Sequence, residues 1–153
     1  MPRANAADKS TRVLAPRTCL VLAAVPFLAP LFARAEVINV SEAELLAMHL
    51  KAEGITLNFP AQADTGATVP LSADIVAPAG LKIASIEVFV PANPNTRALK
   101  LKLAEPQAHF VFSTRLRLAG SQDIWVVATL SNGSRIGASA PTVVTSSACF
   151  DAS

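Results

Sequence analysis

Cysteine and histidine are scarce in this chain. Its 153 residues include two cysteines, Cys19 and Cys149, and two histidines, His49 and His109. A protein zinc site needs three or four clustered Cys, His or acidic ligands. The two histidines are far apart in sequence and from Cys149, so we expect neither a metal site nor a metal cofactor.

The chain also lacks an apolar run long enough to cross a membrane. Its N-terminal apolar stretch, residues 19–32, is interrupted by two prolines, whereas a transmembrane helix needs about 20 consecutive apolar residues. Basic residues precede this stretch, and the small-x-small tripeptide Ala33-Arg34-Ala35 follows it. This order is typical of a cleaved export signal. We therefore expect residues 1–35 to be a signal peptide and the mature protein to begin at Glu36, in the periplasm and without a membrane anchor.

An adjacent arginine pair before the apolar stretch is also missing, which favours the general secretory route over the twin-arginine route. Cys19 follows Arg17-Thr18, which differs from a lipoprotein signal, and it should leave with the leader. Cys149 is then the only remaining thiol, so no internal disulfide can form and the fold must depend on its hydrophobic core.

Positive charge is scarce beyond the leader. Residues 36–153 hold eight Lys and Arg against ten Asp and Glu, with no basic run. Nucleic acid binding depends on neutralising phosphates with clustered basic side chains. We expect no nucleic acid partner.

One short helix is predicted after the leader. Ser41 and Glu44 have the spacing of a capping box, in which each side chain satisfies the other's backbone N–H. The residues that follow at helical spacing on one side are Leu45, Leu46, Met48 and His49. Gly54 is the expected stop. These signals predict a single amphipathic helix of about three turns, with His49 at its edge.

From residue 54 onward the apolar period is two, which is typical of strands. The predicted strands are 55–59, 68–76, 83–90, 98–103, 109–118, 123–130, 134–138 and 142–145. Turn residues separate them, among them Asp64-Thr65-Gly66, Asn93-Pro94-Asn95 and the hairpin signal Ser131-Asn132-Gly133. Many short strands of this kind predict an all-β sandwich over residues 36–145, preceded by the one helix.

Alternation assigns faces to two strands. Leu99, Leu101 and Leu103 alternate with Lys100 and Lys102, so the leucines should face the core. In the next strand Phe110, Phe112, Leu116 and Leu118 point inward, and His109, Ser113, Arg115 and Arg117 point to solvent.

The strand around Trp125 is apolar on both faces. It should therefore be a central strand, or one whose second face meets a partner.

Residues 146–153 form a tail around Cys149. Its neighbours are small or polar apart from one aromatic: Ser146, Ser147, Ala148, Phe150 and Asp151. Such a segment buries little, so we expect a flexible arm beyond Thr145. Four extended steps would carry the sulfur about 13 Å from the sandwich.

The chemistry expected of Cys149 is attachment, not catalysis. An exposed cysteine is mainly the unreactive protonated thiol at neutral pH, and the negative charge of Asp151 disfavours the thiolate. A catalytic nucleophile needs an adjacent base, and none is evident. Activation would have to come from a partner's active site.

Other interpretations of the cysteine remain open at this point. It could be an incidental unpaired thiol, or it could form an intermolecular disulfide in an oxidising compartment. The protein would then be an exported structural or binding module with a sandwich fold.

From about residue 55 to 145 the sequence resembles SoxY, the sulfur carrier of the SoxYZ complex in bacterial sulfur oxidation. The likeness lies in Asn93-Pro94-Asn95, in the strand from Ser113 to Ala119, in the Ser131-Asn132-Gly133 hairpin and in the C-terminal cysteine. The resemblance implies an immunoglobulin-like sandwich that is not an enzyme, with no organic cofactor. Sulfur intermediates would be held covalently on Cys149 and handled by docking enzymes of thiosulfate-type oxidation. A SoxZ-like subunit would be the heterodimer partner.

The arm departs from the Gly-Gly-Cys-Gly-Gly sequence of that family. Ser146-Ser147-Ala148 precedes the cysteine and Phe150-Asp151 follows it, which resembles a paralogue branch with an Ala-Ala-Cys-Ile-Glu arm. Phe150 is far bulkier than glycine, so the resemblance leaves open which enzymes accept this arm.

Cleavage after Ala35 gives the first testable expectation. N-terminal sequencing of protein from the periplasmic fraction of the native host should start at Glu36. Soluble cytoplasmic protein that retains residues 1–35 would contradict the export assignment.

Overall fold

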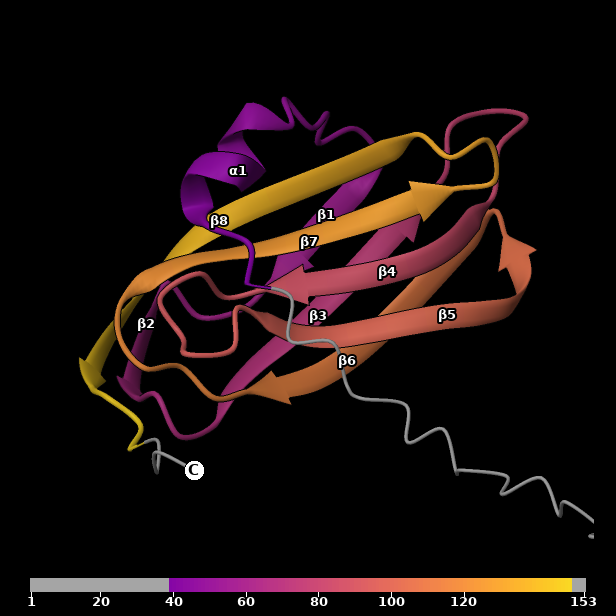
Figure 1. Cartoon of the computed structure of the whole chain (residues 1–153). Helices are drawn as coiled ribbons and strands as arrows, with labels where there is room; N and C mark the ends of the chain where they lie inside the picture. The colour runs from indigo at the N-terminus through magenta and orange to yellow at the C-terminus, as the bar shows by residue number, and fades with distance from the viewer. Residues whose placement is uncertain (1–38, 150–153) are drawn as a thin grey trace, which may run out of the picture. The chain divides into compact units, whose positions relative to one another are not determined.

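Strands dominate the part of the chain that the structure describes, which is residues 39–149 of a computed structural model (Figure 1). The elements in chain order are α1 (Glu42–Ala47), β1 (Ile55–Asn58), β2 (Gln62–Thr65), β3 (Val69–Val76), β4 (Ile83–Phe89), β5 (Arg97–Gln107), β6 (His109–Leu116), β7 (Gln122–Leu130) and β8 (Arg135–Ser146). No helix within these residues is long and apolar enough to cross a membrane.

The strands form two sheets. The smaller sheet has the order β1-β3-β6, and the larger has the order β2-β8-β7-β4-β5. Neighbouring strands are antiparallel except for β2 and β8, which are parallel. The predicted β-sandwich with one short helix is confirmed.

The main core lies between the two sheets. In β3 every second residue is buried, with Val69, Leu71 and Ile75 fully inaccessible. They belong to one cluster with residues of the larger sheet such as Ile86 and Val126. Each such side chain contributes roughly 1.5 to 3 kcal/mol through burial. The predicted inward faces of β5 and β6 are confirmed, because Leu99, Leu101, Leu103, Phe110 and Phe112 all pack against this cluster.

A second, smaller core lies on the outer face of the larger sheet. Phe89 of β4 and Trp125 and Val127 of β7 are buried there together with Leu45 of α1. The strand around Trp125 is therefore central, between β4 and β8, and its second apolar face is covered by the chain's own helix. That face does not call for a partner protein. The Trp125 indole nitrogen has no hydrogen-bond partner among the described residues.

Helix α1 begins as predicted but is shorter. Ser41 and Glu44 form the capping box, and the hydrogen bonds from Ser41 lower the pKa of Glu44. The helix ends at Ala47, well before the predicted stop at Gly54, because His49 adopts a left-handed backbone with φ of 45°. His49 is exposed, and so is Leu46, which the helical spacing had placed on the inward side.

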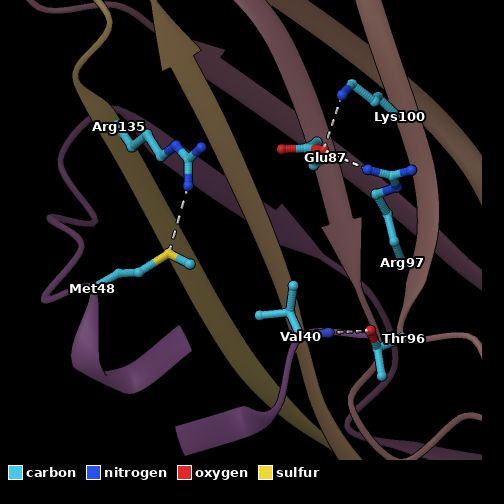
Figure 2. A network of polar contacts seen from close by, with 7 residues as sticks. All are labelled: Val40, Met48, Glu87, Thr96, Arg97, Lys100 and Arg135. Carbon is cyan, nitrogen blue, oxygen red and sulfur yellow. Dashed lines mark hydrogen bonds and ion pairs between the residues drawn. The ribbon is translucent and has the colours of Figure 1, made fainter. Parts of the chain in front are cut away.

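Polar contacts hold both ends of α1 on the sandwich (Figure 2). Before the helix, the Val40 N–H donates to Thr96 Oγ1 at 2.8 Å. After it, Arg135 of β8 approaches the Met48 sulfur at 3.9 Å. The following segment then reaches β8, where the Gly137 N–H donates to the Lys51 carbonyl at 3.0 Å.

Three strands differ from the sequence prediction by more than two residues. Strand β8 is continuous, although the prediction divided it near Pro141. Proline is tolerated there because β2 pairs with β8 only beyond it, from Val143 to Ser146, so β8 is an edge at Pro141. Strand β2 was missed, and Asp64 and Thr65 belong to it and not to a turn. Strand β5 extends to Gln107, four residues beyond its predicted end.

Neighbouring leucines on α1 provide a matched test of the second core. Leu45→Ala should lower the free energy of unfolding by about 2 to 4 kcal/mol, because it removes the fully buried side chain that covers Trp125. Leu46→Ala makes the same chemical change at a residue that is 58% exposed, and it should stay within about 0.5 kcal/mol of the parent. Urea denaturation measures both values. Equal effects of the two substitutions would show that α1 is not docked as described.

Candidate functional site

Cys149 is the last residue that the structure describes, and it is exposed and unpaired. Within residues 39–149 its thiol forms no hydrogen bond, and no group of three His, Cys, Asp or Glu residues is placed to hold a metal ion. Nothing in this part of the chain therefore activates the thiol or supplies it with a metal. Phe150 and Asp151, the predicted arm residues that follow it, lie outside the described residues.

The residues just before Cys149 are attached to the sandwich. The Gly66 N–H donates to the Ser146 carbonyl at 2.7 Å, and the Ala148 N–H donates to the Leu118 carbonyl at 3.1 Å. The Leu118 N–H in turn donates to the Gly66 carbonyl at 2.8 Å. These three backbone bonds join β8, the turn after β2 and the segment after β6 at one end of the molecule. We call residues Ser146, Ser147 and Ala148 the arm root.

This geometry corrects the predicted start of the arm. Ser146 is the last residue of β8, and Ala148 is only 8% exposed, so a free segment does not begin after Thr145. Only Ser147 of the root is both exposed and without a strand pairing. The predicted 13 Å reach assumed four free residues before the sulfur. With Ala148 held, the thiol extends by about one residue, or roughly 3.5 Å of backbone, from its last attachment.

Gly66 is required at the arm root by close packing. A Cβ atom at this position would lie 2.2 Å from the Leu118 carbonyl oxygen and 3.0 Å from the Ala148 nitrogen. The sequence pattern assigned Gly66 to a turn, because glycine is common in turns. Its role in bringing three backbone segments together was not predicted.

Asn93 holds the other side of the segment that carries Leu118. Its side chain is buried, donates to the Arg117 carbonyl at 2.6 Å and accepts from the Ala119 N–H at 2.8 Å. Gln122 adds a donor to the same oxygen at 3.1 Å. Asn93 is thus a positioning residue, since it fixes residues 117–119, to which the arm root is bonded. The sequence singled out its tripeptide only as a turn and as part of the family likeness.

The two histidines lie away from the arm root. His109 is exposed on β6, as predicted, and its Nε2 is 2.7 Å from Asp74 Oδ1 on β3. His49 follows the C-cap Met48 of α1 and is exposed. The structure brings neither of them to Cys149.

Comparison with known proteins gives a family match. A protein-family model described as "Sulfur oxidation protein SoxY" matches residues 43–149, a range that begins in α1 and ends on Cys149. A search of curated proteins found no match.

Solved structures include a SoxY protein among the similar folds. The sulfur carrier protein SoxY from Chlorobium limicola f thiosulfatophilum is 25% identical, with a TM-score of 0.54 over 62% of this chain and 82% of its own. The superoxide reductase (neelaredoxin) E23A from Ignicoccus hospitalis is 13% identical, with a TM-score of 0.48 over 69% of this chain and 89% of its own. Fibronectin(III)-like modules of CbhA from Clostridium thermocellum are 20% identical, with a TM-score of 0.39 over 59% of this chain and 93% of theirs.

The packing at Gly66 leads to a testable expectation. Gly66→Ala should lower the free energy of unfolding by about 1 to 3 kcal/mol, because backbone atoms must move to admit the methyl group. It should also speed hydrogen exchange at the Ala148 N–H, which NMR measures directly. Gly120→Ala is the control, since its Cβ would meet only Ser147 Oγ at 4.0 Å. Parent-like exchange at Ala148 in the Gly66 variant would contradict this account of the arm root.

Proposed function

The chain belongs to the SoxY family of sulfur oxidation proteins, and on that premise we propose that it is a periplasmic carrier that holds sulfur intermediates covalently on Cys149. The observation that carries the proposal is that the family match extends to Cys149, which is exposed just beyond the end of β8 at Ser146. Within this proposal the protein is a substrate for partner enzymes and performs no catalysis itself.

The exposure of the thiol supports attachment of cargo. A group bound to the Cys149 sulfur would extend into solvent, where a second protein can reach it. The thiolate is the reactive form of cysteine. Because no base within the described residues contacts the thiol, we infer that the loading enzyme removes its proton.

Loading has a defined balance for a thiosulfate-type substrate. One S–S bond forms between the Cys149 sulfur and the terminal sulfur of thiosulfate, the thiol releases one proton, and two electrons leave. The loading enzyme must therefore carry an electron acceptor, which this chain does not supply. A disulfide-linked adduct of this kind is released by reductant, whereas a thioether-linked adduct is not.

The attached root changes how an enzyme would reach the cargo. Because Ala148 is bonded to Leu118, the thiol cannot extend far into a deep channel unless that bond breaks. We infer that docking enzymes contact the end of the sandwich formed by the arm root and residues 117–121, or that they release Ala148 when they bind.

The proposed partner is a SoxZ-like subunit, as the SoxYZ complex of the family implies. Support for this pairing comes from family membership alone, since α1 covers the Trp125 face that the sequence offered as a second argument. Export also remains part of the proposal. Its support is the leader sequence at residues 1–35.

Substitution of Cys149 tests the carrier role. Cys149→Ser should change the free energy of unfolding by no more than about 0.5 kcal/mol, because the side chain is exposed. Oxidation of sulfur compounds in the native host should be lost. Intact-mass measurement on native protein should find an added sulfur-containing group on the parent and none on the variant.

A second variant tests whether carrier function needs the thiol at position 149 or only a thiol near the C-terminal end of β8. Ser147→Cys combined with Cys149→Ser keeps one thiol but moves it into the arm root, between two residues with backbone bonds to the sandwich. This protein should fold normally and remain without carrier function. Full activity of Cys149→Ser, or native parent protein that never carries an added mass at Cys149, would refute the proposal.

A further inference from the structure

Three arginines border one surface hollow at the end of the sandwich. It is lined by Asn93 and Asn95 of the turn after β4, by Arg97 at the start of β5, by Arg115 near the end of β6 and by Arg117 just after that strand. We call it the arginine hollow. The sequence had assigned Arg115 and Arg117 to an exposed strand face, and the fold adds Arg97 from a distant part of the chain.

The charge of the arginine hollow is positive. Its lining includes no carboxylate. Glu87 lies 3.3 Å from Arg97, but it is also 3.6 Å from Lys100, so one negative charge is shared between two cations (Figure 2). Arg115 has no ion-pair partner among residues 39–149.

The hollow is built on a fixed frame. Asn93 is 9% exposed and is bonded to the backbone on both sides of Leu118, at Arg117 and Ala119. The Arg97 side chain is held near β4 by Glu87 and is 18% exposed. A site whose groups are already ordered loses less conformational entropy when it binds a ligand.

We propose that the arginine hollow binds a sulfate-type oxyanion, namely sulfate, thiosulfate or a sulfonate group. Guanidinium groups donate paired hydrogen bonds to planar or tetrahedral oxyanions and remain charged at all physiological pH values. The exposed side-chain amide of Asn95 adds a neutral polar group of the kind that orients an anion. A concave lining with several cations and no carboxylate favours a small anion of more than one charge.

The hollow lies close to the arm root. In residues 117–119, the Arg117 carbonyl and Ala119 N–H bond to Asn93, whereas both backbone groups of Leu118 bond to Gly66 and Ala148. Asn93 of the hollow and Ala148 of the arm root are therefore both bonded to this one short segment, through different backbone groups. Two interstrand spacings give a separation on the order of 10 Å. The bound oxyanion could come from solution, or it could be the terminal sulfonate of a group carried on Cys149. This second source rests on the proposed function.

Titration of Cys149→Ser protein with sulfate and with thiosulfate tests the site without covalent loading. At constant ionic strength, saturable amide NMR shifts should appear at residues 93–97 and 115–117. The double variant Arg115→Gln with Arg117→Gln should weaken binding at least tenfold. Lys102→Gln removes a positive charge from exposed β5 outside the hollow and should weaken binding less than twofold.

Several outcomes of this titration would overturn the site. These are the absence of saturable shifts, an equal loss in Lys102→Gln, or a preference for an acidic peptide over both oxyanions. Circular dichroism and unfolding curves establish that the arginine variants are folded. If Cys149 carries no cargo in the host, this titration is unaffected, so the two proposals fail separately.

A loaded parent protein distinguishes the two sources of the anion. Reaction of the Cys149 thiolate with tetrathionate forms a Cys–S–S–SO₃⁻ adduct and expels thiosulfate, which balances without another oxidant. If the carried sulfonate occupies the hollow, the loaded protein should bind free sulfate at least fivefold more weakly than Cys149→Ser, and the shifts at residues 115–117 should be present before titration.

If the hollow instead binds an oxyanion from solution, the loaded protein and the Cys149→Ser protein should bind sulfate with equal affinity. The same comparison can be made with Arg97, Arg115 and Arg117 substituted in both proteins. If the loaded protein still binds sulfate more weakly than Cys149→Ser in that background, the carried sulfonate does not act through this hollow.

Discussion

The backbone of Leu118 is the point on which the described site depends. Its N–H donates to the Gly66 carbonyl and its own carbonyl accepts from the Ala148 N–H, while its side chain is fully buried in the main core. A hydrogen bond that is lost in such a place leaves a polar group with no substitute partner. The position of the thiol is therefore tied to the same core that stabilises the sandwich.

The apolar outer face of the larger sheet is a second feature that constrains the fold, because it must be buried. Phe89, Trp125 and Val127 would expose a large apolar patch if nothing covered them, and such patches usually mark an interface. Here a helix of six residues is enough to cover this patch, because the chain on both sides of the helix is hydrogen bonded to the sandwich, at Thr96 before it and at β8 after it. A strand that is apolar on both faces therefore predicts that both faces are buried. It does not predict whether a segment of the same chain or a partner protein buries the second face.

Local periodicity explains which parts of the fold could be predicted. The faces of β5 and β6 and the hairpin after β7 depend on alternation and on turn residues such as Gly133, which adopts φ of 83°. Strand β2 depends on parallel pairing with a segment about 80 residues away, as in Gln62 with Val143, and no neighbouring residue indicates such a pairing. Ala148 is likewise attached through a backbone hydrogen bond, and any residue type except proline could donate that bond, so the sequence does not reveal it. The candidate cysteine was therefore identified from the sequence, while the length of the arm that carries it was not.

The parallel pairing of β2 with the end of β8 also has a mechanical consequence. Strand β8 is paired with β7 as far as Thr142, opposite Gln122, and from Val143 to Ser146 it is paired with β2. Traction on Cys149 along the direction of β8 would load both ladders in shear, so that several hydrogen bonds resist together. Traction across the sheet would instead peel β8 from β2 one bond at a time. A force along the strand axis therefore meets more resistance than a force across the sheet, and the arm root is released more easily from the side.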